Sequence, residues 1–183
     1  LFRSSAASDV YKRQTLNLKE EDTKEELTKS IKKVLKMQTL IKKWDDLSTD
    51  EVQSIFGLRS EVFIVEQECP FQDVDGRDPE ADHLLLYENN ILCGYTRIFP
   101  KNTYFKEASF GRTVVKKTHR GKGYGHVLVK ESIAFLKSKK ENTIKISAQS
   151  YLKKFYLSYG FIPKGEEYLE DNIPHTAMFL TFS

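Results

Sequence analysis

The stretch THRGKGYGHVL at 118–128 places three glycines at alternate positions behind two basic side chains, and an apolar stretch with helical spacing follows. With the preceding residues 108–116 (ASFGRTVVK), it predicts a strand, a turn at 117–123 and a helix at 124–137. The first turn of a helix has unpaired backbone N–H groups and the positive end of its dipole, and glycine lets an anion approach them closely. The unit is therefore a candidate anion site.

Other interpretations of this turn have to be weighed against a phosphate site. A nucleotide P-loop needs Ser or Thr after Gly-Lys, but Lys122 is followed by Gly123. A dinucleotide fingerprint needs glycines at its first, third and sixth positions, which Gly121, Gly123 and Gly125 do not match. A flexible turn without a ligand stays an alternative, because glycine-rich turns are common.

Length and composition limit the class of protein. The 183 residues are 39% hydrophobic and 30% charged, which suits one core, and no apolar run of about 18 residues predicts a membrane span. The two cysteines, Cys69 and Cys93, lack the spacing of a metal or redox motif, so we expect free thiols in the cytoplasm. A net charge of +3 is mild. The lysine clusters at 29–43 and 137–140 lack interleaved aromatic residues, so nucleic acid is not an expected partner.

The N-terminal end differs from the rest of the chain. Residues 1–14 (LFRSSAASDVYKRQ) have no periodicity and resemble translated sequencing-adapter sequence. Residues 15–36 are dense in Lys and Glu with apolar residues at helical spacing, and the first methionine is Met37. We expect 1–36 to be a non-native or disordered leader and 37–183 to form a single domain.

The remaining chain alternates strand and helix patterns. The sequence predicts a first strand at 37–44, a helix capped by Thr49 or Asp50 with an apolar face that reaches Phe63, and a polar acidic loop at 66–82. Two apolar runs at 83–87 and 91–99 predict an antiparallel hairpin. The later elements are a strand at 144–148, a short helix at 152–159 and a last strand at 178–182.

Several motifs resemble one known family. RGKGYG (120–125), after FGRTVV (110–115), resembles the Gln/Arg-x-x-Gly-x-Gly/Ala signature of the GNAT superfamily of acyltransferases, and FYLSYGF (155–161) resembles a second element of that superfamily. VFIVEQECPFQDVDGRD (62–78), ISAQSYLKKFYLSYGF (146–161) and EDNIPHTAMFL (170–180) are similar to the ElaA-like branch, in the same order. The resemblance covers nearly all of 37–183.

The resemblance implies an α+β fold and a co-substrate, acetyl-CoA. The implied fold is a twisted, mostly antiparallel sheet with helices on both faces, splayed between its fourth and fifth strands, here 108–116 and 144–148. Pantetheine amides can pair with the freed strand edge, because unpaired backbone groups need partners. The implied backbone contacts come from Thr113, Val114 and Val115. The implied pyrophosphate contacts come from Arg120, Gly121, Lys122, Gly123, Tyr124 and Gly125.

Acetyl transfer to an amine needs a neutral nitrogen, a positioned carbonyl and a proton for the leaving thiolate. Tyr156, which matches the family's tyrosine, is the candidate general acid, and its alternative role is core packing between Phe155 and Phe161. A backbone N–H within 113–115 can stabilise the oxyanion. Glu66, His175 or a water held by either is the candidate base, although a structural hydrogen bond explains His175 equally well. The four histidines show no ligand spacing, so no metal is expected.

The acceptor is expected to be a primary amine of a small molecule or peptide. The acidic loop at 66–82 could attract a cationic amine, and the candidate substrate-binding residues are Gln67, Asp75 and Arg112. Arg112 could bind an acceptor carboxylate or pair with one of the loop's acids, and a solvated loop is the plainer alternative. A non-catalytic acyl-CoA sensor of the same fold is the competing function, and a homodimer is conceivable.

Overall fold

The computed structural model describes residues 37–182, so the expectation for the leader at 1–36 lies outside the described residues. The chain divides after Gln38, and Thr39–Ser183 form the larger compact unit. No helix within the described part of the chain is both long and apolar enough to cross a membrane.

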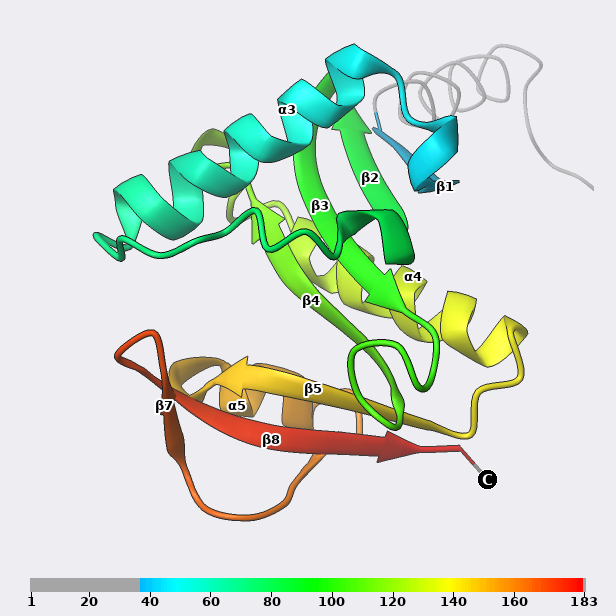
Figure 1. The fold of residues 1–183 in the computed structure, drawn as a ribbon, viewed down its shortest axis with the longest axis vertical. Coiled ribbons are helices and arrows are strands. Elements are labelled where there is room, and N and C mark those ends of the chain that lie inside the picture. Colours follow the sequence, from blue (N-terminus) through cyan, green and yellow to red (C-terminus); the bar gives the residue numbers. More distant parts are fainter. Residues whose placement is uncertain (1–36, 183) are drawn as a thin grey trace, which may run out of the picture. The chain divides into compact units, whose positions relative to one another are not determined.

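A single sheet forms the centre of this unit (Figure 1). Its strand order is β1-β2-β3-β4-β5-β8-β6, and β7 also pairs with β8. The β4–β5 pair is parallel, whereas β2–β3, β3–β4, β5–β8, β6–β8 and β7–β8 are antiparallel. The strands are β1 (Met37–Lys43), β2 (Asp82–Glu88), β3 (Ile91–Phe99), β4 (Ala108–Val115), β5 (Thr143–Gln149), β6 (Ile162–Pro163), β7 (Tyr168–Glu170) and β8 (Ile173–Thr181).

The sheet opens between β4 and β5. These strands pair only at Ala108↔Ile144 and Ser109↔Lys145 and then diverge, as Figure 1 shows. The expected splay between the fourth and fifth strands is therefore confirmed. Beyond Ser109, β4 keeps β3 as its partner on one side and faces the gap on the other. Backbone groups that face such a gap need another partner.

Helix α3 (Thr49–Arg59) covers one face of the sheet (Figure 1). The helix was predicted, but Ser48 caps it rather than Thr49 or Asp50: the Ser48 hydroxyl accepts from the Glu51 N–H while the Glu51 carboxylate accepts from the Ser48 N–H. A π-helical segment, Ser60–Glu66, continues it. The packed side chains on this face are Ile55, Leu58, Val62, Leu85, Leu92, Tyr95 and Val114.

Helices α4 (Tyr124–Ser138) and α5 (Lys153–Leu157) pack on the other face. Successive strand residues point to opposite faces, so Leu84 and Leu86 join this second core while Leu85 belongs to the first. The second core also contains Leu128, Leu136, Ile144, Ile146, Tyr156, Phe161 and Met178. Short 3₁₀ segments occur at Trp44–Asp46, Asp78–Glu80, Lys117–His119 and Ser150–Leu152.

Two hairpins show where the sequence was and was not sufficient. The expected β2–β3 hairpin is confirmed, and Asn89 and Asn90 both have positive φ, as a type I′ turn requires. The last strand, however, begins at Ile173 rather than 178, and β7 was not predicted. Pro174 and the polar residues around it hid this hairpin from a pattern-based prediction, because proline is unusual inside a sheet.

Candidate active site

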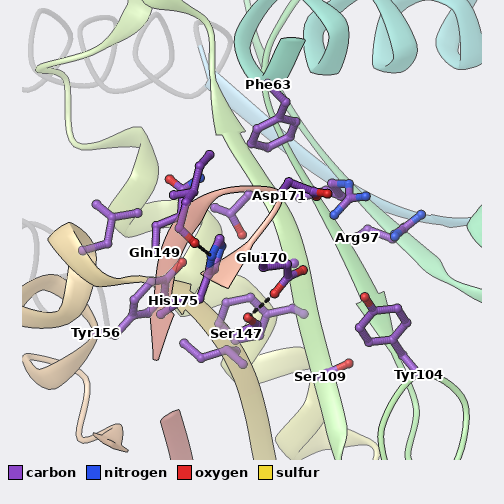
Figure 2. Close-up of a pocket in the computed structure, with 18 of the residues that line it drawn as sticks. Phe63, Arg97, Tyr104, Ser109, Ser147, Gln149, Tyr156, Glu170, Asp171 and His175 are labelled. Carbon is purple, nitrogen blue, oxygen red and sulfur yellow. Dashed lines mark hydrogen bonds between the residues drawn. The ribbon is translucent and has the colours of Figure 1, made fainter. Parts of the chain in front are cut away.

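A pocket of about 130 Å³ lies where β4 and β5 separate (Figure 2). Side chains from β4, β5, α5, the π-helical segment and the β7–β8 hairpin line it. The pocket therefore lies beside the edges that β4 and β5 leave unpaired with each other.

A β-bulge shapes the β4 side of this pocket. The β3–β4 register passes from Tyr95↔Val114 to Arg97↔Gly111, so Arg112 and Thr113 together face Thr96. Arg112 has a φ of 51°, a left-handed conformation that costs energy for a residue with a Cβ. The hydroxyl of Thr96 donates to that of Thr113 at 3.3 Å. The bulge ends regular pairing beside the pocket and sets the direction of the β4 backbone there.

Tyr156 belongs both to the core and to the pocket. Its side chain packs against Phe110 and Phe161, with ring centroids 6.4 and 5.8 Å away, and is only 7% exposed, yet it lines the pocket. Burial raises the pKa of Tyr156 to about 12, although a hydrogen bond with Thr113 opposes the shift. The phenol therefore stays protonated across the neutral pH range and is available as a donor.

His175 and Gln67 lie on the opposite side of the pocket from β4. His175 is paired in register with Gln149, and the Gln149 side-chain amide donates to Oε1 of Gln67 at 3.4 Å. Nδ1 of His175 lies 2.8 Å from the carbonyl oxygen of Ile173. Since a carbonyl only accepts, Nδ1 carries the proton, and Nε2 is the acceptor of the neutral ring.

Two further polar side chains, Ser147 and Glu170, line the same pocket and were not predicted from the sequence. The Ser147 hydroxyl donates to Oε2 of Glu170 at 2.6 Å and lies 2.6 Å from the Tyr168 hydroxyl. Serine has one proton to donate, so Tyr168 donates to Ser147 and Ser147 to Glu170. Glu170 stood inside the motif EDNIPHTAMFL, but only the β5–β8 and β7–β8 pairings bring it to Ser147.

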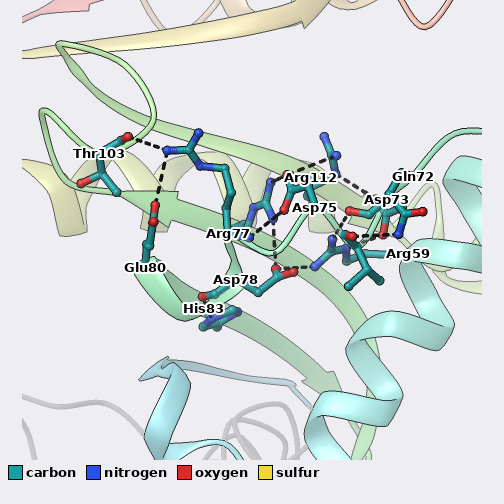
Figure 3. Close-up of polar contacts among 12 residues, drawn as sticks. Arg59, Gln72, Asp73, Asp75, Arg77, Asp78, Glu80, His83, Thr103 and Arg112 are labelled. Atoms are coloured by element: carbon teal, nitrogen blue, oxygen red, sulfur yellow. Dashed lines mark hydrogen bonds and ion pairs between the residues drawn. The ribbon is translucent and has the colours of Figure 1, made fainter.

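The acidic loop is not a free solvated loop, because three of its aspartates pair with three arginines (Figure 3). We call this set the Arg–Asp ring. Its contacts run in a closed circle: Arg59 to Asp73 at 2.8 Å and to Asp78 at 2.6 Å, Arg97 to Asp78 at 3.1 Å and to Asp75 at 2.7 Å, and Arg112 to Asp73 at 2.8 Å and to Asp75 at 3.7 Å. Three positive and three negative charges leave the ring formally neutral.

The ring fixes the ionisation of its members. Burial alone would raise the pKa of Asp75, but the two hydrogen bonds and the charge of Arg97 outweigh it and lower that pKa to about 2. Burial likewise opposes the charge on Arg59, yet Asp73 and Asp78 raise its pKa. Of the two roles expected for Arg112, the structure shows the pairing with an acid.

The glycine-rich turn precedes α4 as the sequence predicted. Gly123 is the N-cap with a φ of 80°, and no side chain caps the first turn. Nε of Arg120 donates to the carbonyl oxygen of Val115 at 3.1 Å, and its other nitrogens contact the Glu66 carboxylate at 2.5 and 3.0 Å. The Lys122 ammonium lies 2.7 Å from Oε2 of Glu88. We call this turn at 120–125, with its uncapped N–H groups and two cations, the cradle. Such groups favour a bound anion.

The cradle and Tyr156 lie on the same part of the molecule. A Cβ added to Gly125, in the first turn of α4, would lie 3.8 Å from the Phe155 ring, and the rings of His126 and Phe155 are 4.9 Å apart. His126 is also hydrogen-bonded to Tyr159. Since Phe155 directly precedes Tyr156, the N-terminus of α4 contacts the helix that carries the candidate acid.

The pocket gathers some of the predicted residues and not others. Tyr156, His175, Gln67, Arg112 and Thr113 all line it. Glu66 and Asp75 do not, and each is held by an arginine. The hydrogen bonds of Arg120 lower the pKa of Glu66, which makes Glu66 a weaker base. Val114 and the residues from Arg120 to Gly125 lie outside the lining of this pocket, along β4 and in the cradle. Within 37–182, no cluster of three or more His, Cys, Asp or Glu residues could hold a metal ion.

Comparison with known proteins gives a consistent result. Residues 44–182 match the family model described as acetyltransferase (GNAT) domain. Protein ElaA of Escherichia coli is 36% identical over 136 residues, which are 73% of this chain and 89% of that protein.

Solved structures agree. A crystal structure of E. coli ElaA superimposes with a TM-score of 0.72 at 32% identity, over 78% of this chain and 98% of that one. An acyl-CoA N-acyltransferase from Pseudomonas aeruginosa gives 0.75 at 34% identity with the same coverage. A GNAT family acetyltransferase from Elizabethkingia anophelis, solved with acetyl-CoA bound, shares the fold at 15% identity and a TM-score of 0.56, over 80% of this chain and 99% of that one.

Proposed function

Because the chain belongs to the GNAT acetyltransferase family, whose members are acyltransferases, we propose that it transfers an acetyl group from acetyl-CoA directly to a primary amine. One observation carries the proposal: the uncapped start of α4 and the buried Tyr156 lie on adjoining elements, and Tyr156 lines the pocket between β4 and β5. The acceptor is a small molecule or peptide that supplies the amine.

The cradle supplies the binding energy for the donor. The N–H groups that follow Gly121 and Gly123, with Arg120 and Lys122, would hold the diphosphate of acetyl-CoA. The backbone of Thr113, Val114 and Val115 borders the gap and would pair with the pantetheine amides. An N–H in this stretch would stabilise the oxyanion that forms when the amine attacks.

Tyr156 would assist the leaving group. As the C–N bond forms and the C–S bond breaks, negative charge develops on sulfur, whose thiol has a pKa of about 8.5. Tyr156, with a pKa of about 12, is a weaker acid than that thiol. It therefore acts mainly by donating a strong hydrogen bond to the developing thiolate, and the proton lost from nitrogen can complete the thiol.

His175 is better placed than Glu66 to accept the proton of the incoming ammonium. Its Nδ1 is held by the Ile173 carbonyl, so Nε2 has a lone pair, and the residue lines the pocket. Glu66 is engaged by Arg120 and does not line the pocket. We therefore assign the base role to His175, directly or through an ordered water.

The test is an assay of thiol release with the full chain, acetyl-CoA and a panel of primary amines. We expect acetyl-CoA binding and thiol release only when an acceptor amine is present, with the acetylated amine identified by mass spectrometry. Binding without turnover would support the acyl-CoA sensor instead. No binding of CoA at millimolar concentration to folded protein would overturn both. A cytoplasmic location and a homodimer stay predictions from the sequence.

A further inference from the structure

We propose that the acceptor is a primary amine carried on an aromatic body, and that Glu170 binds its ammonium group. This inference rests on the proposed function and names the substrate class of the same site. It follows from the walls of the pocket, from its charges and from one buried hydroxyl.

Aromatic side chains supply much of the apolar wall. They come from separate elements: Phe63, Phe71, Phe99, Tyr104, Phe105 and Phe110. Some of these rings pack on one another, with Phe99 stacked on Tyr104 at 5.2 Å and Phe105 edge-on to Tyr104 at 4.7 Å. A cationic side chain of this chain already lies over Phe71, Phe99, Tyr104 and Phe105. The edges and remaining faces of the rings suit another ring. The walls therefore favour an aromatic body over a short aliphatic one.

The charges of the pocket favour a cation. Arg97 and Arg112 line it, but both belong to the neutral Arg–Asp ring. Glu170 and Asp171 also line it, and neither has an ion-pair partner among residues 37–182. The nearby Lys145 ammonium lies over the Phe105 ring at 4.1 Å and is not part of the lining. The pocket thus carries an excess of negative charge at the β7–β8 hairpin.

Glu170 is held in position to use that charge. The chain of hydrogen bonds from Tyr168 through Ser147 fixes Oε2 of the carboxylate. Oε1 has no hydrogen-bond partner within the described part of the chain, and the residue is only partly exposed. An ammonium N–H pairs strongly with a carboxylate that is already oriented and partly desolvated. Oε1 is therefore the atom that would receive the acceptor's ammonium group.

The same hairpin carries the proton acceptor. Tyr168 is paired in register with His175, and their rings are stacked with centroids 6.3 Å apart. Tyr168 thus contacts both the Ser147–Glu170 pair and His175. An ammonium group bound by Glu170 would lie on the hairpin that presents Nε2 of His175. Loss of its proton there would leave the neutral nitrogen that attack on the thioester requires.

One buried hydroxyl of the pocket indicates that the aromatic ring of the acceptor carries a polar group. Ser109 is 2% exposed and lines the pocket, and its Oγ has no hydrogen-bond partner among the described residues. In Figure 2 it lies with Tyr104 toward one end, whereas His175 and Gln149 lie toward the other. A buried hydroxyl without a partner is costly, so a ligand hydroxyl at that end would relieve the cost. Tyramine combines all these features and is the probe we choose.

Direct binding to the full chain in the presence of CoA tests the inference with matched ligands. Tyrosol replaces the ammonium group of tyramine by a hydroxyl, tyrosine adds a carboxylate, and butylamine removes the ring. We expect tyramine to bind at least about tenfold more tightly than each of the other three, because a charge-assisted hydrogen bond and a buried ring each change affinity by that order. If tyrosine bound as tightly as tyramine, Arg112 would be the partner indicated for the acceptor's carboxylate, and the inference would be overturned. If butylamine bound as tightly, the aromatic side chains would not select the acceptor, and that part of the inference would be wrong.

Variants test whether Glu170 is the residue that binds the ammonium group of the acceptor. Glu170→Gln should remove the preference for tyramine over tyrosol while KM for acetyl-CoA stays within about twofold. The matched control is Glu167→Gln, an exposed residue of the preceding loop, which removes the same charge and should keep the preference. Ser147→Ala, which leaves Glu170 in place but unoriented, should reduce the preference in part. An unchanged preference in folded Glu170→Gln protein would sink the assignment.

The outcomes separate this inference from the proposed function. Turnover of other amines without preference for tyramine would leave the acetyltransferase in place and remove the aromatic acceptor. Tight, Glu170-dependent tyramine binding without thiol release from acetyl-CoA would keep the pocket assignment and overturn the transferase. Turnover of tyramine with a raised KM for tyramine in Glu170→Gln supports both.

Discussion

Tyr156 shows how one residue can belong to a core and to a reaction site. Its ring is packed among Phe110, Phe155 and Phe161, which immobilises it, while its position in the pocket lining points to a role in chemistry. Burial raises its pKa to about 12. The alternatives of core tyrosine and general acid are therefore compatible, because the packing that buries the ring also aims the hydroxyl.

The variant Tyr156→Phe separates the two roles. It keeps the ring and loses the hydroxyl, so we expect kcat to fall by about a hundredfold while the melting temperature and the KM for acetyl-CoA change little. Tyr159→Phe, one turn away and outside the pocket lining, is the control. Since the pKa of Tyr156 is about 12, its ionisation should cause no loss of kcat up to about pH 10. Full activity of Tyr156→Phe would restrict this residue to packing.

At the scale of an element, the start of α4 combines two requirements. Gly123 ends the turn in a left-handed conformation, with a φ of 80°, and no side chain caps the N–H groups of the first helical turn. Nothing lies within 4 Å of a Cβ added there, so space alone would admit alanine. The backbone conformation favours glycine here, and the proposed anion would also need the close approach to the N–H groups that glycine allows.

Two glycine variants distinguish these requirements. Gly165 has a φ of 85° and equally open surroundings, but it lies in the loop before β7. We expect Gly123→Ala and Gly165→Ala to lower the free energy of unfolding similarly, by about 1 kcal/mol, since both force alanine into a left-handed conformation. Only Gly123→Ala should also raise the KM for acetyl-CoA, by about tenfold. Equal KM values in both variants would argue against the cradle. Urea unfolding and steady-state kinetics supply the measurements.

At the scale of the whole unit, the Arg–Asp ring ties the acidic loop to three elements. Arg59 comes from α3, Arg97 from β3 and Arg112 from the bulge of β4, and all three reach aspartates of one loop. Buried ion pairs are costly to break because a remaining charge is left without its partner. The ring therefore holds the loop beside the pocket and connects the stability of the fold to the shape of the site.

The Arg–Asp ring makes the free energy of unfolding depend on pH. The pKa of Asp75 is about 2 in the folded protein and 3.8 ordinarily, so its contribution is full above pH 3.8 and is lost as the pH falls through 2. The contribution of Tyr156 to stability depends on pH in the opposite direction. Its pKa is raised from 10 to about 12 in the folded protein, so this contribution is lost as the pH rises through that range. We expect the free energy of unfolding to be nearly constant from about pH 5 to about pH 10 as far as these groups are concerned.

Denaturant unfolding across pH 2 to 8 tests the acid side. Asp75→Asn should be less stable than the unmodified protein at pH 7, and the difference should shrink toward pH 2, where Asp75 itself becomes protonated. Glu80→Gln removes an exposed carboxylate of the same loop whose one ion-pair partner among residues 37–182 is Arg77, at 3.4 Å, and it should change stability little. A difference that stays constant with pH would show that Asp75 acts through packing and not through its charge.

The sequence by itself determined the order of most elements, the anion cradle and the tyrosine. The cradle is local, because the strand, turn and helix that build it are consecutive, and the alternation of apolar residues that marks them lies within a short window. The family motifs added the splay, which the structure confirms, and the proposed role of Tyr156. The last hairpin was missed because its pairing partners, not its own residues, define it.

Only the tertiary structure decided how the charges are used. Nothing within a short window indicates that Asp73, Asp75 and Asp78 neutralise arginines from three distant elements, or that Ser147 orients Glu170. An ion pair or a hydrogen bond between distant residues depends on which strands become neighbours, and the sheet sets that arrangement through long-range contacts. The residues of the proposed donor site could therefore be named from the sequence, whereas the proposed acceptor site depends on contacts that only the fold creates.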